Sequence, residues 1–180
     1  MINLPDLKSA QVNGKKVFLR TDLDVPISEN GIEDDTRLAE GLETLKYLLD
    51  NNAHVIIAGH LGRPEGQDEK FSLKSIADWY AKKFTSIAKA GKIGDFDGWQ
   101  ITSQLYLLEN LRFYPEEEAN PSTSSGQVFA QKLASLAEVY VNDSFATVHR
   151  AHSSIVGIAK LLPHFAGFML AREVNILSTL

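Results

Sequence analysis

The apolar run at residues 54–59 (His-Val-Ile-Ile-Ala-Gly) constrains the fold more than any other feature of this sequence. It contains β-branched residues, ends at a glycine and is too short for a helix, which favours a strand. It also lacks the alternation of polar and apolar residues that a strand with one face in water would show. A strand buried on both faces needs helices on each side of its sheet, so the run predicts the central strand of a parallel sheet.

Segments with helical spacing alternate with further apolar runs of the same kind. The leucines between residues 38 and 49 recur at helical spacing, and the pair Asn51-Asn52 is a polar stop. We expect further helices over residues 72–84, capped by Ser72, and over residues 122–136. The remaining strands are expected at residues 16–22, 104–108 and 138–142, with residues 91–98 as a glycine-rich connector. This alternation predicts a three-layer α/β/α doubly wound parallel sheet, Rossmann-like, in a single lobe.

Composition excludes several classes of protein. Hydrophobic residues make up 44% of the chain and charged residues 23%, which is the balance of a globular domain and not of a disordered chain. The absence of cysteine excludes a thiol nucleophile, a disulfide scaffold and a cysteine-based zinc site. A net charge of −5 argues against a nucleic-acid or membrane-surface partner. With no signal peptide or membrane span in the sequence, we expect a cytoplasmic protein.

The placement of the arginines gives the first indication of function. Of the six arginines in the chain, three follow predicted strands and a fourth opens the helix after the first strand. These are Arg63, Arg112, Arg150 and Arg37. In an open parallel sheet, ligands bind beyond the carboxyl ends of the strands, so the four guanidinium groups are expected to converge on one crevice. Because arginine holds phosphate and carboxylate in bidentate geometry, we expect a small, multiply anionic ligand there.

Histidines lie near the same strand ends. His60 directly follows the central strand, which places it on the rim of the predicted crevice. His149 and His152 are three residues apart, but no carboxylate partner is in register, so no metal site is expected. The run Glu116-Glu117-Glu118 reads as a solvated loop or helix start. Without a Gly-x-Gly-x-x-Gly fingerprint or a phosphate-binding loop, a dehydrogenase domain is disfavoured.

The segments at these strand ends resemble the motifs of phosphoglycerate kinases. The matching segments occur in the family's order, and the likeness extends from about Val12 to Leu180. They are residues 20–26 (Arg-Thr-Asp-Leu-Asp-Val-Pro), 34–37, 59–64 (Gly-His-Leu-Gly-Arg-Pro), 109–113 and 141–152. Each motif alone is moderately specific, and five motifs in order are very specific.

The resemblance implies the N-terminal lobe of a two-lobed glycolytic kinase. In the family this lobe binds 3-phosphoglycerate or 1,3-bisphosphoglycerate for reversible phosphoryl transfer to ADP, and a C-terminal lobe binds Mg-ADP or Mg-ATP. Residues 1–167 would be the substrate-binding domain and residues 168–180 the start of the interlobe helix, with the nucleotide-binding domain absent from this chain. We therefore expect no cofactor bound by this chain, no activity of the chain alone, and a monomer whose partners are the substrate and its own C-terminal lobe.

The resemblance also implies roles for individual residues. Arg37 would face the transferring phosphoryl group as the catalytic residue. His60, Arg63, Arg112 and Arg150 would hold the substrate phosphate. The full expected substrate-binding set is Asp22, Leu23, Asp24, Arg37, His60, Leu61, Gly62, Arg63, Arg112 and Arg150. No metal ligand is implied. A stand-alone anion-binding module without kinase activity is the alternative function.

Two departures from the family pattern lead to separate expectations. Asp24 stands where the family usually has Asn, and its carboxylate would oppose an anionic substrate if it faced the crevice. Otherwise it would turn away and accept hydrogen bonds from loop amides before Pro26. Ala146 stands where the family usually has a glycine, and we expect this change to stiffen the loop that carries Arg150.

Near the end of the chain, Leu170, Val174 and Leu177 share a helical face. We expect this face to lack a partner within the chain.

Overall fold

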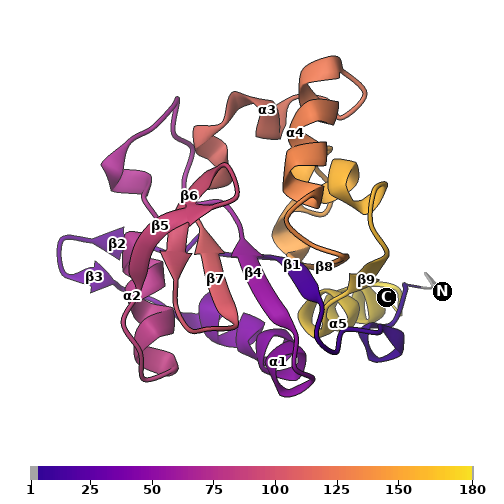
Figure 1. Cartoon of the computed structure of the whole chain (residues 1–180), viewed down its shortest axis with the longest axis horizontal. Helices are drawn as coiled ribbons and strands as arrows, with labels where there is room; N and C mark the ends of the chain where they lie inside the picture. The colour runs from indigo at the N-terminus through magenta and orange to yellow at the C-terminus, as the bar shows by residue number, and fades with distance from the viewer. Residues whose placement is uncertain (1–3, 180) are drawn as a thin grey trace.

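The computed structural model describes residues 4–179 and has a seven-stranded, mostly parallel sheet at its centre (Figure 1). The strand order is β5-β6-β7-β4-β1-β8-β9. The parallel strands are β7 (Leu105–Leu108), β4 (His54–Ala58), β1 (Lys16–Thr21), β8 (Val139–Asp143) and β9 (His164–Ala166). The chain therefore has the expected α/β architecture, with β1 and β4 in the interior of the sheet.

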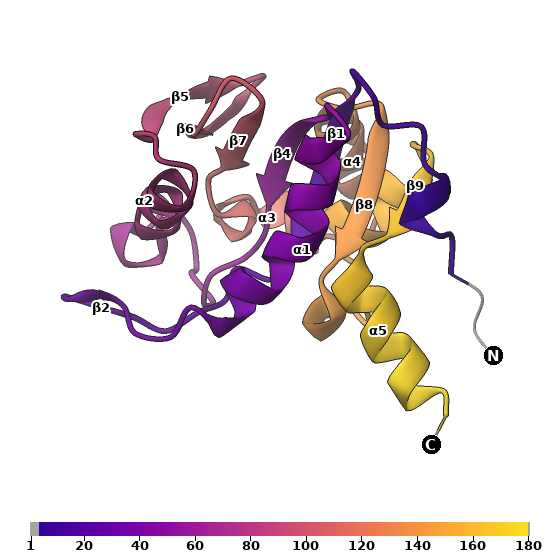
Figure 2. The same cartoon turned by 90° about the horizontal axis from the view of Figure 1, so that it is seen from below.

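Helices cover both faces of the sheet, as the buried apolar runs require. On one face lie α1 (Thr36–Asp50), α2 (Lys74–Lys83) and α5 (Phe168–Leu177); on the other lie the short α3 (Pro115–Glu118) and α4 (Ser124–Ala134) (Figures 1 and 2). Alternate residues of β1 reach different layers, because successive side chains of a strand point to opposite faces. Val17 and Leu19 belong to the core under α1, whereas Phe18 packs with the core under α4.

Short elements complete the chain between these layers. A small hairpin of β2 (Ile27–Ser28) and β3 (Gly31–Ile32) forms a separate two-stranded sheet. Within residues 4–179 there are also four 3₁₀-helical turns and one π-helical turn. They are η1 (Leu7–Ser9), η2 (Glu69–Phe71), η3 (Leu111–Phe113), η4 (Phe145–Thr147) and the π-helical η5 (Ser153–Gly157). Two of them, η3 and η5, lie beside the candidate site described below.

The prediction of a glycine-rich connector at residues 91–98 is wrong. The segment forms most of an antiparallel hairpin, β5 (Lys89–Ile93) and β6 (Phe96–Gln100), which extends the sheet beyond β7. A Cβ atom at Gly98 would lie 2.3 Å from the carbonyl oxygen of Leu107 in the neighbouring strand. This glycine therefore marks a close approach of two strands, not a flexible link.

The start of α2 also differs from the prediction. The helix begins at Lys74, and the residue before it, Leu73, makes no side-chain cap. The Glu109 carboxylate instead accepts hydrogen bonds from the Ser72 hydroxyl at 2.7 Å and from the Leu73 amide at 2.8 Å. The Ser72 hydroxyl also accepts from the Lys74 amide at 3.3 Å, as the predicted cap requires, and the carboxylate from the end of β7 is a second acceptor at the positive end of the helix dipole.

The first turn of α5 is bound firmly to the rest of the lobe. The Leu170 amide donates to Asp143 at 3.1 Å, and the Phe168 amide donates to the Thr44 hydroxyl at 2.9 Å. Leu170 is buried, so the expectation that its apolar face lacks a partner is wrong for this residue. Leu177 and its neighbour Ile176 are exposed, as expected for the far end of the helix.

No helix within residues 4–179 is both long and apolar enough to cross a membrane.

We predict that Asp143→Ala lowers the free energy of unfolding by about 1–2 kcal/mol, because the first turn of α5 then loses its capping acceptor. Urea unfolding measures the change, and hydrogen exchange at the Leu170 amide should become faster. Asp78→Ala is the control, since it removes only the exposed Lys74–Asp78 ion pair and should cost less than about 1 kcal/mol. Equal losses in the two variants would contradict the capping role.

Candidate functional site

Three of the four predicted arginines line one pocket at the carboxyl ends of the strands. The pocket has a volume of about 400 Å³ and is lined by Arg63, Pro64, Glu65, Gly66, Arg112, Phe113, Pro115, Glu118 and Arg150. Its arginines come from the segments that follow β4, β7 and β8. We call this the arginine pocket. Its walls concentrate positive charge in an otherwise acidic chain, so it is suited to an anion.

Arg112 is the most tightly held of the three. Its side chain is only 8% exposed, and its Nε donates to the Glu118 carboxylate at 2.8 Å. One terminal nitrogen donates to the carbonyl oxygen of Gly62. The guanidinium is thus oriented by two different segments before any ligand binds.

Arg37 lies apart from the lining of the arginine pocket. It belongs to the first turn of α1, and its half-exposed side chain approaches Asp22 at 3.5 Å. It also donates to the backbone carbonyl of Asp24 at 3.0 Å. Asp22 itself is mostly buried and accepts a hydrogen bond from the Asp24 amide at 3.2 Å. Arg37 and Asp22 therefore form a second polar group at the same end of β1.

The carboxylate of Asp24 has a hydrogen-bond partner that neither of the two expectations for this residue named. Its carboxylate accepts a hydrogen bond from the Gly62 amide at 2.9 Å, not from amides before Pro26. Gly62 has a φ of +60°, and a Cβ atom there would lie 2.2 Å from the ring of Phe71. Only glycine fits this position without strain, so the Asp24 contact depends on it.

Two further members of the predicted set can offer only their backbone to a ligand. The side chain of Leu23 is fully buried, and that of Leu61 is 5% exposed. Both leucines pack in the core under α1. Their role is to fix the course of the loops that carry Asp24 and Arg63.

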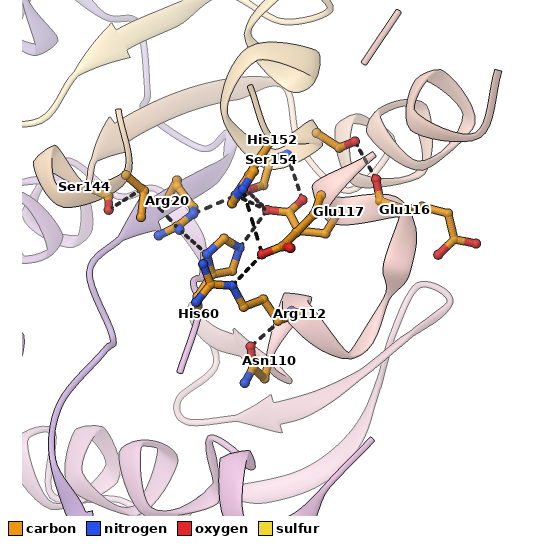
Figure 3. A network of polar contacts seen from close by, with 12 residues as sticks. Arg20, His60, Asn110, Arg112, Glu116, Glu117, Ser144, His152 and Ser154 are labelled. Carbon is orange, nitrogen blue, oxygen red and sulfur yellow. Dashed lines mark hydrogen bonds and ion pairs between the residues drawn. The ribbon is translucent and has the colours of Figure 1, made fainter. Parts of the chain in front are cut away.

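His60 is buried and does not line the arginine pocket. Its Nδ1 lies 3.1 Å from a terminal nitrogen of Arg20, and its Nε2 lies 2.8 Å from the Glu117 carboxylate (Figure 3). Because a guanidinium only donates, His60 Nδ1 must accept, which leaves the proton on Nε2 to be donated to Glu117. Both ring nitrogens are thus occupied, and the pKa of His60 is lowered chiefly by burial and then by the charge of Arg20.

Sequence reasoning missed Arg20 and Glu117, which lie at the two ends of this network. Arg20 is in β1 and is 1% exposed, and Glu117 in α3 is fully buried. The expectation of a solvated Glu116-Glu117-Glu118 run is therefore wrong for its middle residue. The available signal was Arg20 itself, because an arginine within a buried strand requires a buried acceptor elsewhere in the chain.

Burial disfavours the negative charge of Glu117, whereas its hydrogen bonds and the nearby Arg20 stabilise that charge. Burial raises the pKa of Glu117 to about 7, while hydrogen bonds from Ser154 and the charge of Arg20 act in the opposite direction. The Ser154 amide donates to Glu117 at 2.9 Å, and the Ser154 hydroxyl donates to its other oxygen. Three donors therefore meet this one carboxylate.

His60, Glu117 and His152 could be mistaken for a metal site, since their ligand atoms lie within 4.8 Å of one another. The hydrogen-bond pattern argues against this, because a metal at His60 Nε2 would force a proton onto Nδ1, which faces the donor of Arg20. Burial and the nearby arginines also lower the pKa of His152, to about 4, which shows that a positive charge is disfavoured there. His149, the other histidine of the sequence pair, is exposed and does not join the cluster.

We predict that Arg20→Met lowers the free energy of unfolding by about 3–5 kcal/mol, because it leaves Glu117 buried without its cation. The loss should be smaller at pH 6 than at pH 8, since protonation of Glu117 removes the unpaired charge. Urea unfolding at both pH values is the measurement. Arg172→Met, which breaks an exposed pair with Glu43, is the control and should cost less than about 1 kcal/mol. A loss for Arg20→Met as small as the control's would contradict a paired buried charge.

Comparison with known proteins identifies the family. The family model described as phosphoglycerate kinase matches residues 7–180. A phosphoglycerate kinase of Desulforudis audaxviator is 43% identical over 97% of this chain and 45% of its own length. The cytosolic phosphoglycerate kinase of Nicotiana tabacum is 44% identical over 95% of this chain and 43% of its own length.

Solved structures agree with this result. The phosphoglycerate kinase from Coxiella burnetii superposes with a TM-score of 0.87 and 31% identity, covering 98% of this chain and 44% of that one. The enzyme from Pyrococcus horikoshii gives a TM-score of 0.79 and 29% identity. The chain thus spans less than half the length of the relatives it matches. With the fold, the motifs and the family model in agreement, the chain belongs to the phosphoglycerate kinase family and corresponds to its N-terminal lobe.

Proposed function

We propose that this chain binds 3-phosphoglycerate and 1,3-bisphosphoglycerate, as the substrate lobe for reversible phosphoryl transfer to ADP. The observation that supports this most is the arginine pocket, in which Arg63, Arg112 and Arg150 line one cavity at the carboxyl ends of parallel strands. Family membership supports the same substrate. A phosphate group would receive charge-assisted hydrogen bonds from guanidinium groups that are already oriented.

Arg37 and Asp22 would act at the other end of the substrate. Arg37 projects from the start of α1, half exposed, and is held by Asp22 and by the Asp24 carbonyl. From there it would offset negative charge on the transferring phosphoryl group, which is the main catalytic contribution in this type of reaction. Asp22 would accept a hydrogen bond from a substrate hydroxyl. A general base is not needed, because the acceptor carboxylate of 3-phosphoglycerate is already deprotonated.

The occupied ring nitrogens of His60 change its proposed role. With Arg20 on one side and Glu117 on the other, His60 has no free ring nitrogen for a substrate phosphate. We assign it to the support of the pocket, not to direct ligand binding. Asp24, Leu61 and Gly62 would contribute through the loop that joins β4 to Arg63.

The Mg-nucleotide is placed outside this chain in our proposal. Magnesium prefers several oxygen ligands, whereas the one cluster of potential metal ligands found among residues 4–179 contains two histidines. Two of the carboxylates near the arginine pocket and Arg37, those of Glu118 and Asp22, are engaged with guanidinium groups. In the complete protein, a second lobe would bring Mg-ADP or Mg-ATP, and closure of the two lobes would exclude water from the reacting groups.

The remaining proposals concern the setting of the protein. We propose a cytoplasmic monomer whose macromolecular partner is its own C-terminal lobe. The alternative, an anion-binding module without kinase activity, differs in one observable way. Joined or mixed with a nucleotide-binding lobe, the chain should support phosphoryl transfer under our proposal and not under the alternative.

We predict that the chain alone binds 3-phosphoglycerate weakly and transfers no phosphate from ATP. Arg63→Ala or Arg112→Ala should weaken binding about tenfold or more, because each charge-assisted hydrogen bond contributes roughly 1.5–3 kcal/mol. Isothermal titration calorimetry measures the affinity, with Arg172→Ala as the matched control away from the pocket. Unchanged affinity in both pocket variants, or ATP-dependent turnover by the chain alone, would contradict this prediction.

A separate prediction concerns the charge of Asp24. Asp24→Asn keeps an oxygen that can accept from the Gly62 amide but removes a carboxylate near the proposed anion site. We expect 3-phosphoglycerate binding at pH 7 to tighten by roughly 0.5–2 kcal/mol, as expected when a like charge is removed at moderate distance. The gain should shrink at high salt, because screening weakens the repulsion in the parent protein. Equal or weaker binding by the variant at low salt would show that the Asp24 charge does not burden the site.

A further inference from the structure

Two bridges connect the buried cation Arg20 to the buried carboxylate Glu117. The first passes through His60, which accepts from Arg20 at 3.1 Å and donates to Glu117 at 2.8 Å. The second passes through the Ser154 hydroxyl, which accepts from Arg20 Nε at 3.3 Å and donates to Glu117. Figure 3 shows both bridges meeting at Glu117. Each bridge has a fixed direction, because a guanidinium can only donate and a carboxylate can only accept.

The members of these bridges lie close in sequence to the arginines of the pocket. His60 is three residues before Arg63, and Glu117 is five residues after Arg112. Ser154 is four residues after Arg150. The three pocket arginines therefore belong to three separate segments that meet at one carboxylate. Arg20 also hydrogen-bonds both His60 and Ser154, as donor, and Glu117 is the carboxylate that accepts from both.

We propose that Glu117 is the positioning residue of the arginine pocket, aligning Arg63, Arg112 and Arg150 through its hydrogen bonds to His60 and Ser154. This inference rests on the proposed function, in that the pocket is taken as the site of the substrate phosphate. Glu117 does not itself line the pocket. It acts through the three segments, and its ionised form is required because all three of its partners donate.

Protonation of Glu117 would therefore disturb the alignment. A protonated carboxyl carries a donor. On Oε2 this donor would face the Ser154 amide; on Oε1 it would face His60 Nε2–H or turn the Ser154 hydroxyl from donor to acceptor, so at least one link would be lost or reversed. The charged and titratable groups near Glu117 come from every element packed around it. They are Arg20 from β1, Tyr140 from β8, His60 after β4, His152 before η5, Arg112 from η3 and Glu118 from its own helix. Burial lowers the pKa of His60 and His152, to about 4 for the latter, so both stay neutral from pH 6 to 8. Burial raises the pKa of Glu117 to about 7, within that range.

The test compares Glu117→Gln with Glu116→Gln, its exposed neighbour in the same short helix. Glutamine at position 117 can keep an oxygen toward His60 Nε2 and the Ser154 hydroxyl, but its amide nitrogen would then face the Ser154 amide, which also donates. With 3-phosphoglycerate as the titrant in calorimetry at pH 8, Glu117→Gln should weaken binding about tenfold, the loss expected for breaking a charge-assisted hydrogen-bond network. Glu116→Gln should stay within about twofold of the parent, since it only changes an exposed charge.

The pH dependence separates positioning from simple packing. The dissociation constant of Glu117→Gln divided by that of the parent should fall from about tenfold at pH 8 toward about twofold at pH 6, because the parent loses the ionised carboxylate as pH falls through its pKa. Protonation of the ligand itself cancels in this ratio. A ratio that does not change with pH would overturn the proposal, as would equal affinities for the two variants.

A measurement on the parent chain covers the case in which Glu117→Gln does not fold. In an NMR titration, the ¹⁵N resonance of His60 Nε2 and the Nε–H resonance of Arg112 should shift with one common midpoint, which reports the protonation of Glu117. Independent midpoints, or no shift at Arg112, would overturn the proposal. The proposed function fails separately: if the parent chain does not bind 3-phosphoglycerate at all, the common midpoint can still be observed without ligand.

Discussion

A guanidinium buried in the central strand of the sheet determines much of the arrangement around the site. Arg20 is surrounded by strands and loops, and a charge in such a place is tolerated only when hydrogen bonds replace those of water. Its partners come from the segment after β4, from η4 and from η5, with Glu117 as the counter-charge beyond them. The need to satisfy one buried cation thus draws together loops that follow three different strands. The arginine pocket lies over the place where they meet.

The same arrangement explains how a cation-rich pocket exists in an acidic protein. Arg112 is neutralised in part by Glu118 at its rim, and Arg37 is held by Asp22 on the far side. Each pairing leaves guanidinium N–H groups available, since the group has five donors and uses only some of them. The repulsion among the arginines is therefore offset before a ligand arrives, and an incoming anion meets groups that are already oriented. Such preorganisation lowers the entropic cost of binding.

Sequence reasoning predicted the fold well because the deciding features are local. The apolar run at β4 and the leucine spacing of α1 each indicate which residues are buried, without reference to the rest of the chain. The convergence of Arg63, Arg112 and Arg150 follows from the parallel topology of the sheet. The failures involve pairs that are distant along the chain. Gly98 was interpreted as part of a flexible connector because the local sequence does not show which strand it packs against. Glu117 was interpreted as solvated because its partners Arg20 and Ser154 lie 97 and 37 residues away along the chain. Periodicity carries no information about such pairs.

The position of β1 in the sheet has a consequence for the order in which the protein can form. β1 pairs with β4, which follows it closely, and with β8, in which Val139 lies opposite Val17. As the chain leaves the ribosome, β1 is made early, but one of its two edges stays open until more than a hundred further residues exist. Arg20 meets Ser154 later still. Contacts between such distant segments form slowly. For most of its synthesis, the growing chain therefore has an unpaired, apolar strand edge and a cation without its native hydrogen bonds, both of which can form non-native contacts. In a nascent chain of this lobe, the edge of β1 is paired only after β8 has emerged, and Arg20 reaches Ser154 only after η5 has emerged.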